Sequence, residues 1–323
     1  MPCIRTKIRR NFAQLFVAEA LNTQEKRQQV QLQEVFLMIF IFALILITIF
    51  LFFPLATYIL FWYETANTAY KDELARISGG KTVSWILRGV FSSVLSNIVA
   101  ISSYPLVLIR KLWRPGPGGR TSTPPVILIH GLYHNVSAWI CYRWWLKRAG
   151  YDRVYAFNYN SFSHDFHQIL EKLDQWIMEV SRSFPGEEII IIGHSLGGLL
   201  AKAYAGRNDA FKGPGVKAII TLGTPYGGSK MVVFGIGRLA GSLSCGAPLI
   251  RELEEIRTSS GVSCTALYSP VDNMVFPAGS LKGPSGWGEE QTDPVCHVGM
   301  LYHGPTFKRV LRRIEAACTN AEA

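Results

Sequence analysis

The sequence predicts an α/β fold, a mostly parallel sheet with helices on both faces, preceded by one or two transmembrane helices. Two observations lead to this prediction. From residue 125 onward, short runs rich in β-branched residues alternate with helical patterns, and the runs are largely apolar along their length. Such alternation is typical of parallel strands covered on both faces. Upstream, residues 35–63 form an apolar run without a charged residue, which is typical of a membrane span.

The apolar run at 35–63 is the first predicted element. About 20 apolar residues cross the hydrocarbon core of a bilayer, so this run is long enough to span it with some tilt. Tyr58, Trp62 and Tyr63 cluster at its far end, where an interfacial belt of aromatic residues would lie. A cleaved signal peptide has a shorter apolar region and a small-residue cleavage site, and neither is evident here. We therefore expect a retained transmembrane helix after a basic N-terminal segment, residues 1–34.

A second apolar segment, residues 89–109, is uncharged but interrupted by serines, Asn97 and Pro105. It is either a second span, which would form a hairpin with the first, or a helix that lies in the membrane interface. We favour the second span within a membrane region at 35–112. Basic residues lie on both sides of the first span, so the positive-inside rule leaves open which side of the membrane carries the downstream domain.

Residues 113–124 are dense in Pro, Gly, Ser and Thr and predict a linker. An α/β domain at 125–317 and a short tail at 318–323 follow. Amphipathic periodicity predicts a helix from Phe166 to Val180 and a terminal helix from Phe307 to Ala317. Predicted strands are 125–129, 153–159, 188–192, 216–222 and 264–269.

A G-x-S-x-G pattern follows the predicted strand at 188–192, and a helical pattern begins directly after it. In this context Ser195 would lie on a strained turn that projects its hydroxyl. Gly193 and Gly197 would be required because strand and helix approach too closely there for side chains. The turn therefore predicts a nucleophilic serine, with an ordinary tight turn as the alternative.

A serine hydroxyl needs a base, which in turn needs a carboxylate to orient it. In folds with this turn the chain order is serine, acid, histidine. Asp272 follows the predicted strand at 264–269, at a carboxyl end where ligands bind. Only His297 and His303 come after it, and we favour His297 as the base because His303 would lie at the start of the terminal helix.

Backbone amides are the expected oxyanion donors. The turn after the first strand, at His130 and Gly131, would present the amide of Leu132, and the helix N-terminus would present that of Leu196. His130 and His194 lie inside turn motifs ahead of the acid, so we expect a structural role for both.

Composition excludes several other classes. The net charge of +10 is concentrated around the apolar segments, and residues 125–323 carry nineteen Lys/Arg against seventeen acids. Without a basic stripe that has interleaved aromatics, nucleic acid is not an expected partner. The six cysteines form no CxxC pair, and no spacing of His and Cys predicts a metal site or a cofactor. Free thiols are the favoured interpretation, with an oxidised pair as the alternative.

Five stretches resemble those of α/β-hydrolase lipases in order and spacing: PVILIHGLYHNVSAW, IIIIGHSLGGLLA, IITLGTPYGGS, LYSPVDNMV and CHVGMLY. The resemblance covers roughly residues 125–316. It is to the bacterial class 2 lipase/esterase group in particular, with eukaryotic GPI-inositol deacylases as more distant relatives. It implies a triad of Ser195, Asp272 and His297, in agreement with the residues chosen above. The sequence differs from the smallest lipases by an apolar stretch at 231–250.

The expected function is that of a membrane-anchored serine hydrolase that cleaves carboxylic esters, acyl lipids among them, in lipid metabolism. The bilayer and the ester are its expected partners, and the sequence leaves the oligomeric state open. An acyltransferase with the same triad is the alternative within enzymes, and a non-catalytic membrane scaffold is the alternative outside them. Residues 231–250 are expected to form either a mobile cover over the acyl site or a core helix.

Overall fold

The computed structural model describes residues 2–113, 123–207, 213–259 and 261–319. Within them six strands form one sheet in the order β2-β1-β3-β4-β5-β6, and every pair of neighbours is parallel. The strands are β1 Val126–Ile129, β2 Val154–Phe157, β3 Ile189–His194, β4 Val216–Leu222, β5 Ser263–Tyr268 and β6 Gly288–Gln291.

The five predicted strands correspond to β1 to β5, and the predicted parallel sheet is confirmed. The sixth strand, β6, was not predicted, because its sequence GEEQ has no apolar residue. It pairs with β5 at the edge of the sheet and is half-exposed or exposed along its length. Backbone pairing to β5 therefore defines this strand, and its side chains carry no strand signal.

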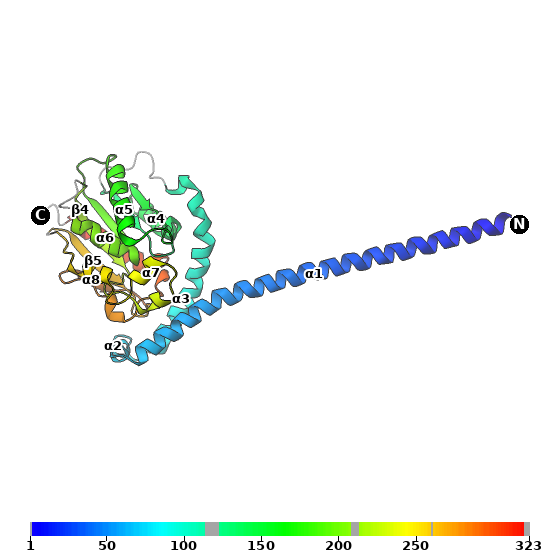
Figure 1. Cartoon of the computed structure of the whole chain (residues 1–323), viewed down its shortest axis with the longest axis horizontal. Helices are drawn as coiled ribbons and strands as arrows, with labels where there is room; N and C mark the ends of the chain where they lie inside the picture. The colour runs from blue at the N-terminus through cyan, green and yellow to red at the C-terminus, as the bar shows by residue number, and fades with distance from the viewer. Residues whose placement is uncertain (1, 114–122, 208–212, 260, 320–323) are drawn as a thin grey trace. The chain divides into compact units, whose positions relative to one another are not determined.

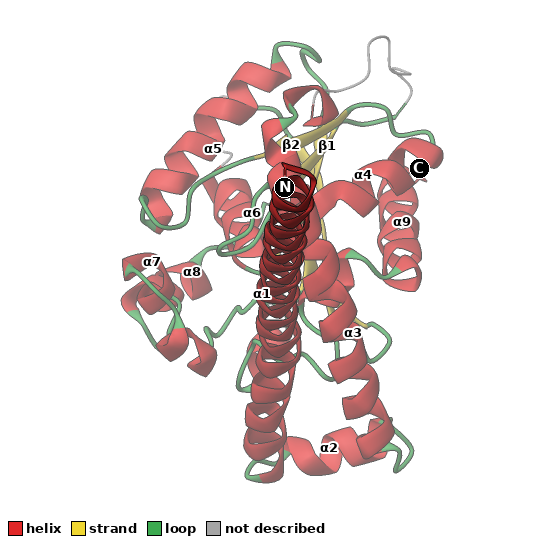
Figure 2. Cartoon of the chain, turned by 90° about the vertical axis from the view of Figure 1, so that its right-hand side faces the viewer, coloured by secondary structure: helices red, strands yellow, loops and turns green. Residues whose placement is uncertain are grey.

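Two apolar layers cover the two faces of the sheet. Along β1, Val126 and Leu128 belong to one layer, and Ile127 and Ile129 belong to the other, as alternation along a strand requires. Figure 2 shows helices on both sides of the strands. The first layer packs on α4 (Ile140–Arg148) and α9 (Gly304–Thr319), and the second on α5 (Phe166–Ser181), α6 (Leu196–Arg207), α7 (Arg238–Ser242) and α8 (Pro248–Glu255).

Three helices precede the sheet: α1 Pro2–Ala66, α2 Tyr70–Ile77 and α3 Thr82–Ser103. The predicted span at 35–63 lies inside α1, which is one continuous helix (Figure 1). The predicted second segment, 89–109, covers most of α3 and the 3₁₀ turn Tyr104–Leu108. By length and composition, Lys26–Ala66 and Thr82–Leu108 are both apolar enough to cross a membrane. Most of the predicted linker at 113–124 and of the tail at 318–323 lies outside the described residues.

The chain divides into two compact units, residues 1–53 and 54–323. Within the second unit, the end of α1 packs with α2 and α3 on the loops that follow β5 and precede α9. Tyr58 donates a hydrogen bond to the carbonyl of Val271 (2.9 Å), and Tyr70 donates to that of Pro270 (2.8 Å). An apolar cluster surrounds these bonds, formed by Tyr58, Phe61, Leu74, Met231, Val271, Phe276 and Cys296. The end of α1, together with α2 and α3, is thus part of the same packed unit as the sheet.

The stretch at 231–250 has features of both expected alternatives. Leu239, Ala240 and Leu243 are buried, as in a core helix. Val233, Phe234 and Ile236 are 73%, 68% and 72% exposed. A mobile cover therefore stays a prediction for the first half of the stretch, and the second half packs into the core.

Candidate active site

Ser195 lies between β3 and α6, on the turn that the sequence predicts. Its φ is +55°, in the left-handed region that a residue with a side chain adopts at an energetic cost. The backbone amide of Ser195 donates to the carbonyl of Leu222 at the end of β4 (2.8 Å), which holds the turn against the neighbouring strand. Ser195 is half-buried at the carboxyl edge of the sheet.

The two glycines around Ser195 are required by close backbone contacts. A Cβ at Gly193 would lie 2.5 Å from the carbonyl oxygen of Gly197, and a Cβ at Gly197 would overlap the carbonyl of Ile129 in β1. No such separation occurs between real side-chain and backbone atoms, so any other residue would push α6 away from the sheet. This close approach of strand and helix is the reason for the G-x-S-x-G spacing.

Asp272 and His297 form a buried pair beside this turn. The Nδ1 atom of His297 lies 2.7 Å from Oδ2 of Asp272, and both side chains are almost fully buried. The other carboxylate oxygen, Oδ1, accepts hydrogen bonds from the amides of Met274 (2.9 Å) and Val275 (3.1 Å). Asp272 accepts at Oδ2, so His297 donates from Nδ1–H, and its Nε2 is left as the acceptor.

The acid–base pair and the serine turn meet at the end of β4. Gly223 follows Leu222, the partner of the Ser195 amide, and a Cβ at Gly223 would lie 3.0 Å from Nδ1 of His297 and 3.1 Å from Oδ2 of Asp272. The structure thus brings together all three residues of the predicted triad. Among the described residues no hydrogen bond joins Ser195 to His297, and catalytic hydrogen bonds are often long in the absence of substrate.

The two predicted oxyanion donors flank the serine. A Cβ at Gly131 would lie 3.0 Å from Cβ of Ser195, so the turn that carries Leu132 lies against the turn that carries Ser195. In the described part of the chain, the amides of Leu132 and Leu196 make no hydrogen bond to another protein group. Tyr133, with a φ of +60°, donates its amide to Oγ of Ser161 (3.1 Å), which fixes the same turn.

His130 makes backbone contacts, in keeping with the predicted structural role. Its Nδ1 lies 2.9 Å from the carbonyl of Gly131, and its Nε2 accepts from the amide of Tyr159 (3.3 Å). The ring stacks on that of Tyr159 with centroids 4.1 Å apart. Burial lowers the pKa of His130 to about 3, so the ring is neutral at pH 7. His130 thus connects the residues that follow β1 with those that follow β2.

His194 and His303 also lie apart from the carboxylate of Asp272. The Nε2 of His194 lies 3.1 Å from the carbonyl of His297, and burial lowers the pKa of His194 well below its usual value. As a neutral donor it holds the backbone of the predicted base. His303 lies at the start of α9, where its Nδ1 accepts from the amide of Thr306 (3.3 Å). This is a capping contact at the start of the terminal helix, where the sequence places His303.

Three positioning residues were not predicted from the sequence. Asn273 accepts a hydrogen bond from the amide of His297 (3.1 Å) and donates to Oγ1 of Thr57 in α1 (2.8 Å). Ser92 of α3 accepts from the amide of Cys296 (2.6 Å). Asn273 had a signal in its position next to Asp272. Thr57 and Ser92 had none, because they lie more than 200 residues from their partners.

A cavity of about 620 Å³ adjoins the oxyanion turn. It lies among the ends of β1 and β2, α5 and the turn after α3. Its lining mixes aromatic and amide side chains, and includes Tyr104, Tyr133, His134, Asn160, Phe162 and Trp176. The ring of His134 is 6.1 Å from that of His194, which precedes Ser195. The cavity is therefore a candidate substrate-binding site.

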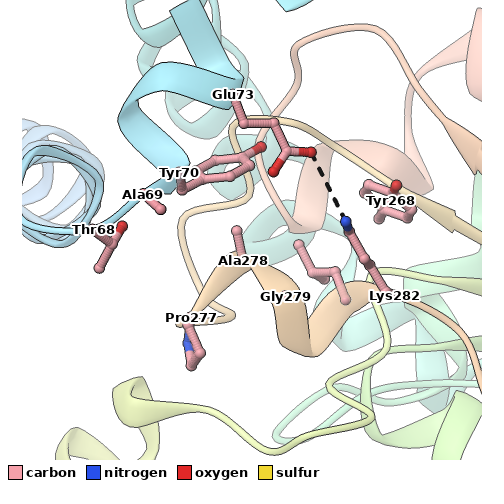
Figure 3. A pocket seen from close by; sticks show the side chains of 10 residues that line it. Thr68, Ala69, Tyr70, Glu73, Tyr268, Pro277, Ala278, Gly279 and Lys282 are labelled. Atoms are coloured by element: carbon pink, nitrogen blue, oxygen red, sulfur yellow. Dashed lines mark ion pairs between the residues drawn. The ribbon is translucent and has the colours of Figure 1, made fainter.

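A smaller cavity of about 250 Å³ lies between α2 and the turn at 277–282 (Figure 3). Glu73 points across it to Lys282, with 3.9 Å between Oε1 and Nζ, and Tyr70 and Tyr268 line it. None of the predicted site residues lines either cavity, and only the larger one adjoins the oxyanion turn. Among the described residues no group of His, Cys, Asp or Glu is arranged to hold a metal ion.

The parallel sheet and the strained serine turn between β3 and α6 are those of the α/β-hydrolase fold, and the chain has this fold, as its sequence predicts. Residues 124–242 match the family model described as alpha/beta hydrolase fold. No curated protein sequence matches the chain.

Solved structures with a similar fold include esterases and lipases. The mature lipase BlEst2 from Bacillus licheniformis superposes with a TM-score of 0.51 at 17% identity, over 62% of this chain and 96% of that chain. A gene product from Listeria innocua gives 0.48 at 15% identity, over 60% and 94%. A bacterial membrane phospholipase A gives 0.42 at 14% identity, over 62% and 81%. At these identities the likeness shows the fold alone, a fold that supports ester hydrolysis. The class 2 lipase group stays a prediction.

Proposed function

We propose that this protein is a membrane-anchored serine hydrolase that cleaves carboxylic esters, with acyl lipids as the substrate class. One observation carries the proposal most directly. A buried histidine–aspartate pair, 2.7 Å apart, lies at the same sheet edge as a serine held at a positive φ. A strained serine beside an oriented imidazole is costly to maintain and is the arrangement that acyl transfer through serine requires.

In the proposed reaction, Oγ of Ser195 attacks the ester carbonyl carbon while Nε2 of His297 takes the hydroxyl proton. The amides of Leu132 and Leu196 donate to the oxyanion of the tetrahedral intermediate. When this intermediate collapses, the alcohol leaves with the proton from His297, and the acyl group stays on Ser195. Water then attacks the acyl-enzyme by the same route and releases the acid. Asp272 keeps the proton of His297 on Nδ1 and stabilises the imidazolium.

Membrane attachment rests on the apolar helices. Val35 to Phe53 of α1 include many apolar side chains that are at least two-fifths exposed, and the segment carries no charge. Such a surface is stable in hydrocarbon and costly in water. An enzyme held at a bilayer meets acyl lipids as its most concentrated esters, which is the reason to propose this substrate class.

The test uses a fluorophosphonate probe, which labels activated serines, on the full chain in detergent or vesicles. We expect labelling and ester hydrolysis by the wild type, and loss of both in Ser195→Ala. Ser183→Ala replaces an exposed serine beyond α5 and serves as the matched control, which should keep both. An unlabelled, inactive wild type that is folded would contradict the proposal and favour a scaffold.

Hydrolysis and acyl transfer are separated by their products. We expect the wild type to release free acid from a long-chain ester even when a lipid alcohol is present. Acylated alcohol as the main product, also lost in Ser195→Ala, would replace hydrolysis by acyl transfer through the same serine.

A further inference from the structure

The two sides of α3 have the reverse of the usual polarity. Its fully buried positions, here called the inner stripe, are small or polar: Gly89, Ser93, Ser96 and Ser103. Half-buried Trp85, Ile86 and Val90 pack on the apolar cluster around Tyr58. Its exposed side, the outer stripe, is apolar: Val83, Leu87, Phe91, Leu95, Ile98 and Ile101. At 3.6 residues per turn these two sets lie on opposite sides of the helix. A helix on the surface of a water-soluble domain has its apolar side buried, so α3 is built for an apolar medium outside the protein.

The inner stripe is attached to the catalytic domain along most of the helix. Ser92 and Ser96 contact the segment before His297, where Ser92 accepts from the amide of Cys296. Directly after α3, the carbonyl of Tyr104 accepts from the side chain of Asn135 in the oxyanion turn region (3.2 Å). From Gly89 to Ser103 the attachment extends over about 21 Å, at 1.5 Å per residue. Figure 2 shows α3 running along this side of the domain.

This attachment is incompatible with a helix that crosses the bilayer. A spanning α3 would carry the irregular loops around Asp272 and His297 into the hydrocarbon core, which is about 30 Å thick. Non-helical backbone at that depth costs several kcal/mol for each unsatisfied polar group. A helix that lies in the interface has no such conflict, because its outer stripe enters the acyl region while the domain stays in water.

A second exposed apolar element lies next to the end of α3. The hydroxyl of Tyr133 is 2.6 Å from the carbonyl of Ile236, and the hydroxyl of Tyr104 donates to the carbonyl of Tyr133 (3.4 Å). These bonds place the exposed side chains of Val233, Phe234 and Ile236 beside the turn after α3, where Leu108 is 80% exposed. The tip and the turn after α3 thus border the oxyanion turn, and Tyr104, Val107 and Tyr133 line the 620 Å³ cavity.

Charge identifies the partner surface. Residues 82–113 contain no acidic residue, and the exposed Lys81, Arg88, Arg110 and Lys111 lie beside or at the ends of the outer stripe. Basic residues along an apolar stripe suit a bilayer with anionic head groups, since each adds attraction at the depth where the helix would lie.

We propose that α3 lies flat in the interface of an anionic lipid bilayer and does not cross it. The outer stripe and the tip at 233–236 enter the acyl region, and the opening of the cavity faces the lipid. The proposal favours the interfacial alternative over the second span expected at 89–109. The inference rests on the membrane attachment in the proposed function and is independent of the proposed ester chemistry. With α1 as the only crossing among the described helices, tags at the two chain ends would lie on opposite sides of the membrane.

Depth measurements test the proposal. A fluorescent amino acid is introduced singly at Val83, Phe91 and Ile101 in the full chain, reconstituted in vesicles that contain anionic lipid, and quenched by lipids with nitroxides at two depths. We expect shallow and equal depths at all three positions. Ile41 in α1 is the internal control and should be deep. The label at Met178, exposed on α5 away from the outer stripe, should not be quenched.

Each other outcome overturns a specific claim. Depths that change steadily from Val83 to Ile101 mean that α3 spans the bilayer. Unquenched labels on α3 with a quenched label at Ile41 mean that water, a second copy or another protein covers the outer stripe. An unquenched label at Ile41 overturns the membrane attachment itself, whatever the result of the ester assay.

A functional readout complements the depths. In Leu87→Ser/Phe91→Ser we expect hydrolysis of a long-chain ester in vesicles to fall about tenfold, because apolar area is lost from the lipid contact. Hydrolysis of a water-soluble short-chain ester should not change, and Met178→Ser should affect neither reaction. An equal fall on both esters would assign the stripe to folding and overturn its role in lipid docking.

Discussion

Asp272 has both carboxylate oxygens engaged before any substrate binds. Two backbone amides and Nδ1 of His297 are its partners, and the side chain is fully buried. A carboxylate held in this way orients the imidazole without having to rearrange during the reaction. Gly223 lies against the same two side chains, and a Cβ there would approach both within about 3 Å. These bonds and close contacts hold the side chains of Asp272 and His297 in one orientation.

The two late histidines are expected to differ sharply in function. His297→Ala should lower kcat/KM by about 10³-fold or more, because no other group holds the proton in the transition state. His303→Ala should retain kcat and lose about 1 kcal/mol of stability, because a capping contact at the start of α9 is removed. Kinetics on a soluble ester together with thermal unfolding of both variants check this. Loss of activity in His303→Ala without loss of stability would mean that the base is assigned to the wrong residue.

At the scale of elements, the helices before the sheet reach the backbone of the predicted base. Thr57 of α1 accepts from Asn273, which in turn accepts from the amide of His297. Ser92 of α3 holds the amide of the preceding residue, Cys296. His297 directly precedes the 3₁₀ turn Val298–Leu301, and these contacts from α1 and α3 hold its backbone together with the bond from His194. Thr57 and Ser92 are therefore positioning residues.

Removal of the Thr57 hydroxyl is expected to displace the base. Thr57→Val keeps the shape of the side chain but leaves Asn273 without its acceptor, and kcat should fall about tenfold or more with little change in KM. Thr57→Ser should restore kcat, because the hydroxyl is retained. Thr48→Val is the matched control, since the hydroxyl of Thr48 is exposed and bonds only within α1. The rates of hydrolysis and of fluorophosphonate labelling measure the effect.

Stability data separate positioning from folding in this series. If Thr57→Val lowers the unfolding midpoint and Thr57→Ser fails to restore kcat, the contact supports the fold and has no specific effect on the base.

At the scale of the whole molecule, one buried carboxylate is expected to make stability depend on pH. Asp174 of α5 is 4% exposed, and its only ion pair in the described region is a long one of 3.6 Å to Arg207 of α6. Burial raises the pKa of Asp174 to about 6 from 3.8, and Arg207 opposes this shift only in part. The folded state thus binds this proton more tightly than the unfolded chain does. The resulting stability is present below about pH 4 and is lost as the pH rises through about 6.

Asp174→Asn should abolish this dependence. We expect the variant to be about 1–2 kcal/mol more stable than the wild type at pH 8, a value reduced for the lost attraction to Arg207, and close to it at pH 4. Unfolding of the full chain in detergent at several pH values measures the difference. If the difference in stability between the variant and the wild type does not grow between pH 4 and pH 6, ionisation of Asp174 does not destabilise the folded state.

Much of the fold and of the candidate site could be predicted because the relevant signals are local. Strands buried on both faces are continuous apolar runs, as in the four isoleucines at 189–192. The serine turn can be recognised in the sequence because the steric limits on Gly193 and Gly197 produce a pattern within five residues. Only β6 lacked such a signal, because the strand is polar and defined by its pairing with β5.

The sequence by itself determined the order of strands and helices along the chain and the strained turn at Ser195, since these depend on short-range sterics and on periodic burial. Only the tertiary structure decided which groups meet. It paired Nδ1 of His297 with Asp272, brought Thr57 and Ser92 to a loop more than 200 residues away, and turned the serine side of α3 toward the protein. The physical reason is that such contacts depend on packing between segments remote in sequence. The pattern of an apolar helix with serines is the same for a helix that spans a bilayer and for one that packs on a domain.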